Sequence, residues 1–535
     1  MSVTKGLCNN NLDDWVAPKL SRLNDRKRPH IIILGRFRSF NPGALPQPNH
    51  LNYCYTVPRT FLIYLSLLFL TACIKPVSFQ ESGIETPETW HTFAGLPGNP
   101  ELWNKPLVVD NCAQVEQRWW CSFGDQTLDA FIARALMNNK TLGIAGTRID
   151  EARAARLSSF SNLMPQISVN ADAQRGNQGF YTADKPLAYE DVTIQASWEL
   201  DLFGKNQARL AAAIALVQNE EILRQGVIVS LLAEVALNYF DYRNYQQQLT
   251  ITEENLSTQK RTLNLTIAQF QEAFASGFDV ERAAAQVATT EARIPTLQIA
   301  VEITRNHLDV LLGSTPGEND DLFAIQEPLK PLDPQIIISA PATILGTRPD
   351  VRAAERSFAS SISTFTAAKK EWFPTINLLT FFGFQGLQGI HNSGQQTTVL
   401  QNLIRTWNVV GTLTQPLINF GRIDSDIEAA GARKQRAYLE YQETVLKALE
   451  DMENALASYL YEIQRNVSLT GAASHNRKAL ELANQQYTNG YTNLLDVLVV
   501  QRNTLEAESV ETESNFKLRK DLVNVYTAAG GGWAY

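Results

Sequence analysis

Residues 203–205 read Phe-Gly-Lys, and the nearly identical triplet Phe-Gly-Arg stands at 420–422, which is 217 residues further along the chain. Further matches share this offset: Ala212-Ala213 with Ala429-Ala430, Gln269-Phe270 with Gln486-Tyr487, Phe274 with Tyr491, and Asp279-Val280 with Asp496-Val497. Pro165-Gln166-Ile167 and Pro374-Thr375-Ile376 match at an offset of 209, so one connection differs by eight residues. Several matched positions that share one offset indicate that the chain contains a duplicated unit.

Each copy is predicted to begin with a helix, over 126–160 and over 347–371, and to continue with two strands. Apolar and polar residues alternate strictly in the first pair of strands, 165–174 and 192–200. The second pair, about 375–385 and 406–416, is less regular and carries aromatic residues. Alternation with period 2 predicts one apolar and one polar face. Segments of about ten residues have the length of a membrane-spanning strand, although a half-buried sheet of a soluble protein alternates in the same way.

A long helix is predicted to follow each pair of strands, after Gly204 and after Gly421. Apolar residues in the second of these helices recur at spacings of three and four, a heptad seam, at Tyr438, Tyr441, Val445, Leu449, Met452, Leu456, Tyr459 and Ile463. At about 1.5 Å per residue each long helix spans roughly 100 Å.

The returning helices, about 278–312 and 495–529, are half as long as the outgoing ones. We therefore expect the short helix of each copy to supply the other half, giving a wall of paired helices with strands at one end. Gly277 and Gly490 are expected to permit the turns at the tips, and Ser276 and Asn493 to cap the helices that follow. Four strands cannot close a barrel, so a sheet that crosses a membrane would require the chain to oligomerise.

The N-terminal segment differs from the remainder of the chain. Residues 1–72 carry nine basic and three acidic side chains, although the whole chain has a net charge of −8. A basic residue precedes the apolar run FLIYLSLLFL at 61–70, and the run ends in Leu70-Thr71-Ala72-Cys73. A secretory signal has this pattern, and its end resembles the lipobox of bacterial lipoproteins, which implies lipid attachment, such as palmitate, at Cys73.

Ile74, rather than Asp, follows this cysteine and implies sorting to the outer membrane. We expect 57–72 to be the signal peptide, 73–118 a lipidated linker, and 1–56 either an extension of the gene model or a disordered leader. The alternative is an ordinary signal peptide, or a buried helix with a chance cysteine.

Composition argues against several classes of function. The negative net charge disfavours a nucleic-acid binder. The six histidines show no zinc-type spacing, and neither a phosphate-binding glycine loop nor a G-x-S-x-G motif occurs. We therefore expect no metal, no cofactor and no enzymatic activity. Cys112 and Cys121 are candidates for a disulfide in an oxidising periplasm.

Specific motifs resemble those of the TolC/OprM/NodT family of outer-membrane efflux and secretion channels. They are Trp119-Trp120-x-x-Phe123-x-Asp125, SWELDLFGK at 197–205, RPDVRAAE at 348–355, Phe373-Pro374, QPLINFGR at 415–422, Leu495-Asp496-Val497-Leu498 and Gly530-Gly531-Gly532-Trp533. They cover 119–535, with the first repeat at 119–325, a linker at 326–346 and the second repeat at 347–535. Together with the lipobox they are most similar to the lipoprotein branch that works with RND-type pumps.

This resemblance implies an α+β membrane protein that forms a homotrimer. A twelve-stranded barrel would cross the outer membrane, and a twelve-helix tunnel would extend through the periplasm. The channel would be a passive exit duct, and a periplasmic adapter (membrane fusion) protein and an inner-membrane RND-type pump would supply specificity and energy. Drugs, dyes, metals and signalling lipids leave through similar ducts.

The family motifs also assign roles to individual residues. Leu495 and Asp496 match the constriction that closes the periplasmic end, and three copies of Asp496 near a symmetry axis would repel one another and could hold a cation. Asp279 and Tyr487 match a link between helices that keeps the aperture shut. The sequence departs from the family pattern at two positions. Thr492 stands where other members have an Arg that strengthens that link, and Val499 stands where many members have a second acidic residue.

The adapter is expected to dock at the two tips, which are Ala273, Phe274, Ala275, Ser276 and Gly277, and Asn489, Gly490, Tyr491, Thr492 and Asn493. Simpler interpretations remain open. The two aspartates could be first-turn acids favoured by the helix dipole, Tyr487 a seam residue and the tips plain helical turns. For the whole protein the alternatives are a duct for type I protein secretion and a periplasmic coiled-coil scaffold without a pore.

Overall fold

The computed structural model describes residues 83–84, 87, 89–94, 107–109, 118–176, 187–324, 332, 336–338, 341–389 and 404–532. All of them belong to one compact unit, Pro76–Tyr535. The predicted leader, the signal peptide, the lipid-attachment residue Cys73 and the candidate disulfide residue Cys112 lie outside the described residues.

The helices confirm the duplication in length and register. Helices α7 (Lys205–Gln271) and α12 (Arg422–Thr488) have 67 residues each, and α8 (Gly277–Leu311) and α13 (Leu494–Ala528) have 35 each. Both long helices follow a glycine in the left-handed conformation, Gly204 or Gly421. Each pair of equivalent helices therefore starts 217 residues apart, as the sequence matches predicted.

The first predicted helix, 126–160, is in fact two helices, α5 (Gln126–Asn138) and α6 (Lys140–Ser161). Asn139 interrupts them with an extended backbone. Its side-chain oxygen accepts a hydrogen bond from the Leu142 amide at 3.0 Å, and its side-chain amide donates to the Leu311 carbonyl of α8 at 2.9 Å. Asn139 therefore caps α6 and ties this break to a distant helix. The second copy breaks at Arg348, between α10 (Pro341–Thr347) and α11 (Pro349–Lys369).

One antiparallel sheet contains the four predicted strands, in the order β2-β3-β5-β6. They are β2 (Gln166–Gly176), β3 (Leu187–Leu200), β5 (Thr375–Gly389) and β6 (Ile404–Thr414). Strand β3 starts five residues earlier than predicted, because Leu187–Asp191 pair with Gln385–Gly389 of β5. Strands β2 and β6 form the two edges of this sheet.

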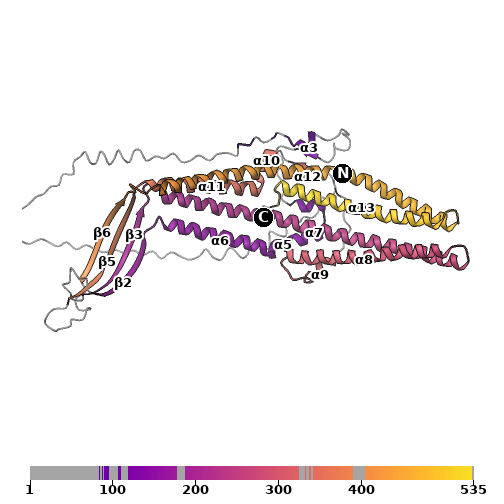
Figure 1. Cartoon of the computed structure of the whole chain (residues 1–535), viewed down its shortest axis with the longest axis horizontal. Coiled ribbons are helices and arrows are strands. Elements are labelled where there is room, and N and C mark those ends of the chain that lie inside the picture. Colours follow the sequence, from indigo (N-terminus) through magenta and orange to yellow (C-terminus); the bar gives the residue numbers. More distant parts are fainter. Residues whose placement is uncertain are drawn as a thin grey trace, which may run out of the picture. The chain divides into compact units, whose positions relative to one another are not determined.

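The helices pack in the way that their lengths predicted, with two shorter helices lying along each long helix. Helices α6 and α8 both pack against α7, and α11 and α13 both pack against α12, while α11 and α13 also contact α7. The strands lie at one end of these helices and the turns of the α7–α8 and α12–α13 hairpins lie at the other (Figure 1). Helix α7 contains a stretch that is long and apolar enough to cross a membrane, but half of this stretch is buried inside the protein, as in a packed core helix.

The remaining elements of the described residues are short, and the last of them directly precedes β5. They are α3 (His91–Ala94), β1 (Leu107–Val109), the 3-10 helix η2 (Trp119–Phe123), α9 (Asp320–Phe323), β4 (Ile336–Ile338) and the 3-10 helix η3 (Lys370–Trp372). Strands β1 and β4 pair in parallel.

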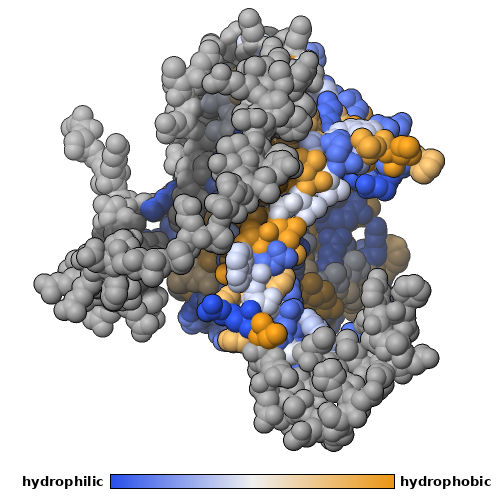
Figure 2. Space-filling view, turned by 90° about the vertical axis from the view of Figure 1, so that its left-hand side faces the viewer, coloured by the Kyte–Doolittle hydropathy of each residue, from blue (hydrophilic) through white to orange (hydrophobic). Residues whose placement is uncertain are grey.

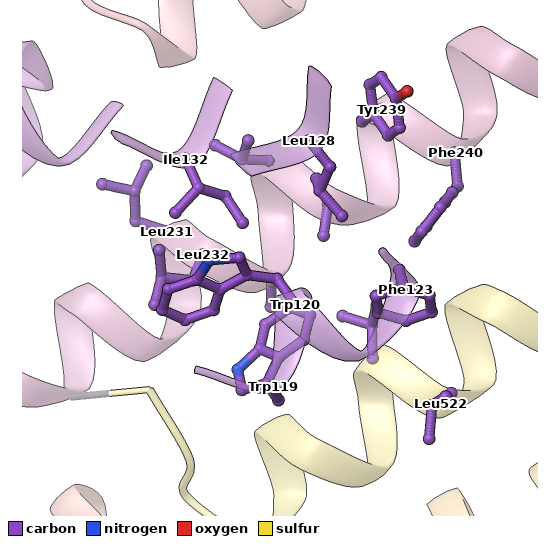
Figure 3. Close-up of a cluster of buried hydrophobic side chains, with 14 of the residues drawn as sticks. Trp119, Trp120, Phe123, Leu128, Ile132, Leu231, Leu232, Tyr239, Phe240 and Leu522 are labelled. Atoms are coloured by element: carbon purple, nitrogen blue, oxygen red, sulfur yellow. The ribbon is translucent and has the colours of Figure 1, made fainter. Parts of the chain in front are cut away.

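The main hydrophobic core lies where η2, α5, α7 and α13 meet (Figure 3). Trp119 and Phe123 of η2 point into it and are 1% and 7% exposed. Phe240 of α7 packs edge-on against Phe123 at 4.9 Å, and Leu522 of α13 is also part of the cluster. The Trp-Trp segment, which resembled a family motif in the sequence, thus anchors the first short helix to the long helices.

A buried hydrogen bond crosses this core. Asp125 caps α5 by accepting from the amides of Thr127 and Leu128, and the Tyr239 hydroxyl donates to its carboxylate at 2.6 Å. Burial and the neighbouring charge of Asp125 raise the pKa of Tyr239 above its ordinary value. The hydroxyl therefore remains protonated and can donate at any physiological pH.

We expect Tyr239→Phe to destabilise the protein by about 1.5–3 kcal/mol, because it removes a buried hydrogen bond to a charged group. The measurement is the midpoint of denaturant unfolding, followed by circular dichroism. Tyr461→Phe is the matched control, because this tyrosine of α12 is 51% exposed. Equal midpoints for the two variants would contradict the prediction.

Candidate functional site: the sheet and the helical tips

The sheet has its apolar face exposed. The register aligns Val169, Ile194, Phe382 and Trp407 in one row across all four strands. Their side chains are between 50% and 70% exposed. Figure 2 looks onto the end of the molecule that carries the strands, where apolar residues reach the surface. A continuous exposed apolar face of this kind marks a membrane or protein contact.

The opposite face of the sheet is polar. Asp172 lies directly opposite Asp191, and Asp191 lies opposite Gln385 of β5. Asp191 and Thr193 are 8% and 2% exposed, and they line a hollow of about 570 Å³. Polar residues thus face inward and apolar residues outward, which is the reverse of a soluble sheet and is typical of strands that line an aqueous pore in a membrane.

The turn of the α7–α8 hairpin leaves an aromatic side chain exposed at its tip. Phe274 is 86% exposed, and Ala273 before it has a left-handed backbone with φ of 61°. The expectation that Gly277 permits this turn was wrong: Gly277 begins α8, and Ala273 takes the left-handed position instead.

The turn of the α12–α13 hairpin is its counterpart. Gly490 has φ of 78°, as expected, and Tyr491 is 83% exposed. Both predicted caps are confirmed, since Ser276 accepts from the Asp279 amide and Asn493 from the Asp496 amide.

Asp279 completes a capping box with Ser276. Its carboxylate accepts hydrogen bonds from the Ser276 hydroxyl at 2.7 Å and from the Ser276 amide at 3.1 Å. These bonds lower the pKa of Asp279 below its ordinary value. The stabilisation is therefore complete above the pKa of the unfolded state, and it is lost as the pH falls through the lower pKa of the folded state.

We expect Ser276→Ala to destabilise the start of α8 by about 1 kcal/mol, the usual cost of losing an N-cap. The readout is hydrogen exchange of the amides at 277–280, which should become faster. Ser257→Ala, at an exposed position on α7, is the control. Unchanged exchange in the Ser276 variant would show that the capping box does not hold this turn.

The two residues of the predicted aperture link are not bonded to each other among the described residues. The Tyr487 hydroxyl donates to the Gln269 side chain at 2.7 Å and lies 3.3 Å from the Thr266 hydroxyl. Tyr487 is buried against Ala283, Leu494, Val497 and Leu498. It therefore joins the two hairpins of one protomer, a role that the sequence did not reveal.

The predicted gate residues lie in the first turn of α13. Leu495 is 43% exposed and Asp496 is also exposed. The Thr492 hydroxyl donates to the Asp496 carboxylate at 2.9 Å. The residue that departs from the family pattern therefore positions the acid that is predicted to form the gate. Leu495, Leu498 and Val499 also line a hollow of about 280 Å³ with Arg282 and Arg502, two cations that the sequence analysis did not single out.

Polar contacts join the two hairpins above the tips. The Gln501 side chain donates to the Thr262 hydroxyl at 2.8 Å, in a buried position. Further along, Asn255 donates to Glu508, and Lys520 pairs with Asp241 at 2.7 Å. Directional polar contacts thus join the two hairpins in addition to the apolar cluster around Tyr487 and the main core.

Comparison with known proteins agrees with this geometry. A model of the family described as "Outer membrane efflux protein" matches residues 131–314 and 340–531. The chain belongs to the outer membrane efflux protein family. Its fold is the TolC-like α+β fold, and the family places it in the outer membrane, from which it extends into the periplasm. Members of this family are trimeric outer-membrane channels that work with efflux pumps.

Individual relatives cover most of the chain. Nodulation protein T of Rhizobium leguminosarum bv. viciae is 27% identical over 78% of this chain and 84% of that protein. The pyoverdine export outer membrane protein OpmQ of Pseudomonas putida is 26% identical over 86% of this chain and 97% of that protein. Among solved structures, the outer-membrane channel OprN is 30% identical with a TM-score of 0.71, covering 84% of this chain and 98% of that one.

The described part of the chain contains no group of three or more His, Cys, Asp or Glu side chains arranged to hold a metal ion. The Cys121 thiol contacts the Asp129 carboxylate at 3.9 Å. Pairing of Cys121 with Cys112 stays a prediction.

Proposed function

We propose that this protein is the outer-membrane channel of a tripartite RND-type efflux system and serves as its passive exit duct. The observation that carries the proposal is the reversed sheet, apolar outward and polar inward, joined directly to helices of 67 residues. The sheet has the polarity of a pore wall in a membrane, and the helices are long enough to extend roughly 100 Å from it.

The sheet requires other copies to complete the pore. Its edge strands β2 and β6 have no further strand partner among the described residues. Hydrocarbon cannot satisfy the backbone groups of an open edge. Three copies supply twelve strands and close the barrel, and their long helices form the periplasmic tunnel.

The remaining roles belong to the same proposal. Lipid on Cys73 anchors the linker 73–118 in the outer membrane, and 119–325 and 347–535 are the two repeats. Leu495 and Asp496 close the periplasmic end, and Asp279 and Tyr487 restrain it. The adapter protein docks on the exposed tips 273–277 and 489–493, and the pump supplies energy and selectivity. The duct itself carries out no chemical reaction.

The test uses the purified full-length protein in two assays. We expect a trimer band on a denaturing gel that disappears on boiling, and ion-conducting events in a planar bilayer. A correctly folded trimer that conducts no ions would overturn the channel and favour a coiled-coil scaffold.

Type I protein secretion is the alternative for the same duct. Deletion of the gene should increase sensitivity to small toxic compounds if the duct serves efflux. Unchanged sensitivity, together with loss of a secreted protein, would favour the alternative.

A further inference from the structure

Two arginines near the helical tips have no acidic partner. Arg282 of α8 and Arg502 of α13 both line the hollow of about 280 Å³ between these helices. Within the described part of the chain, neither guanidinium lies at ion-pair distance from a carboxylate. Arg282 lies over the ring of Phe278 instead, with its guanidinium carbon 5.1 Å from the ring centroid. Such a contact uses the face of the guanidinium and leaves the N–H groups at its edge able to donate.

The duplication explains why this space is open. The offset of 217 makes Val499 the equivalent of Arg282, and Arg502 the equivalent of Ala285. All four of these residues line the hollow. Each copy therefore contributes one arginine and one small apolar side chain, where an acidic residue would have neutralised the charge.

The nearest acids of the two helices are engaged elsewhere. The Asp279 carboxylate accepts hydrogen bonds from the hydroxyl and the amide of Ser276, and the Asp496 carboxylate accepts from the Thr492 hydroxyl. Among the described residues that line the hollow, none is acidic. The two positive charges of Arg282 and Arg502 are therefore not neutralised within the hollow.

The remaining lining combines apolar and polar side chains. Leu495 and Leu498 of α13 supply apolar surface, and Gln286 and Thr289 of α8 supply hydrogen-bonding groups. The volume is close to the lower end of the range for small-molecule pockets. The hollow thus offers two cationic donors next to an apolar wall, in a space of the size of a small organic molecule.

We propose that this hollow binds a small amphiphilic carboxylate. The carboxylate lies between Arg282 and Arg502, because the planar fork of a guanidinium matches the two oxygens of a carboxylate. The apolar part of the ligand packs on Leu495 and Leu498. A lipid of the membrane is not the ligand, because α8 and α13 begin at the end of the helices that lies opposite the strands (Figure 1).

This inference rests on the proposed function and deepens it. It names a class of compound, small organic acids, that the duct recognises at its periplasmic end. A ligand held by both arginines also joins the α7–α8 hairpin to the α12–α13 hairpin, beside the predicted gate residue Leu495.

The binding is tested by fluorescence titration of the purified full-length trimer with naphthoate, a fluorescent aromatic carboxylate. We expect saturable binding of naphthoate and no saturable binding of naphthamide, its neutral isostere. Arg282→Gln and Arg502→Gln should each weaken the binding by about tenfold or more, the usual loss for a hydrogen bond between charged groups. Arg293→Gln is the matched control, because this exposed arginine lies on α8 but does not line the hollow. Its affinity should equal that of wild type.

A second pair of variants tests the role of the missing acid. Val499→Glu should abolish naphthoate binding, because the new carboxylate would occupy the two arginines. Val499→Gln is the matched control, because it has nearly the same size without the charge. It should retain most of the affinity.

Several results would overturn the inference. One is the absence of saturable naphthoate binding by a wild-type trimer that conducts ions, which would leave the two arginines to contact an acidic side chain of the adapter. Equal affinity for naphthamide, or an equal loss in the Arg293 variant, would show that the hollow does not recognise the carboxylate. Failure of the wild-type protein to form any trimer or pore would instead refute the proposed function.

Discussion

Arg348→Met is expected to destabilise the protein by about 3 kcal/mol, the lower end of the range for removing one partner of a buried ion pair. Arg348 is 8% exposed, and its guanidinium bonds Asp350 at 2.7 Å and Asp451 at 2.9 Å. It also donates to the Ala528 carbonyl near the end of α13 at 2.9 Å. One side chain therefore joins α11, α12 and α13.

The lower end of that range applies because the two carboxylates remain accessible to water. The side chains of Asp350 and Asp451 are 47% and 57% exposed, so water can solvate them after the guanidinium is removed. Burial alone would lower the pKa of Arg348, but the bonds to Asp350 and Asp451 outweigh it and raise the pKa above its ordinary value. The arginine stays charged, so its own titration should add no pH dependence to the loss between about pH 5 and 9, a range far below the ordinary pKa of arginine.

Denaturant unfolding of the purified protein measures this effect. The control is Lys447→Met on α12, which removes an ion pair between two exposed side chains, Lys447 and Glu443. Such pairs contribute little, so its midpoint should match that of wild type. A wild-type midpoint for the Arg348 variant would show that the three helices are held together without this arginine.

Asp496→Ala is expected to increase single-channel conductance several-fold and to relieve block by cations. In the proposed trimer three Asp496 carboxylates converge at the periplasmic end, where a ring of acids binds cations and narrows the path. The side chain is exposed and is oriented by the Thr492 hydroxyl. Alanine removes both the charge and the bulk from the constriction.

The control for this experiment is Glu281→Ala, which removes an exposed acid near the start of α8. Both variants are compared with wild type in planar bilayers, with and without a divalent cation. Unchanged conductance in the Asp496 variant would mean that Asp496 is only a favourable first-turn acid, and that another residue closes the duct. An equal increase in both variants would assign the effect to the general charge of the tips.

Local patterns were enough to predict the elements of the fold. The separation of Phe420 and Tyr487 predicted the length of α12, and strict alternation placed β2 and the end of β3 within two residues. Caps at Ser276 and Asn493 were predictable for the same reason, because they act on amides three residues away. The family motifs predicted the gate and tip residues, and these roles stay predictions.

Contacts between distant segments decided the rest. The helix break at Asn139 depends on the Leu311 carbonyl, and the additional length of β3 depends on pairing with the far end of β5. The sequence left Tyr487 as either part of the aperture link or a seam residue. Only the fold places Gln269, more than 200 residues away, beside its hydroxyl. The sequence by itself determined the duplicated helices and strands, because their periodicity is local. Only the tertiary structure decided which face of the sheet is exposed, where a helix breaks and what each tip residue bonds, because those outcomes depend on partners that the chain brings together only when it folds.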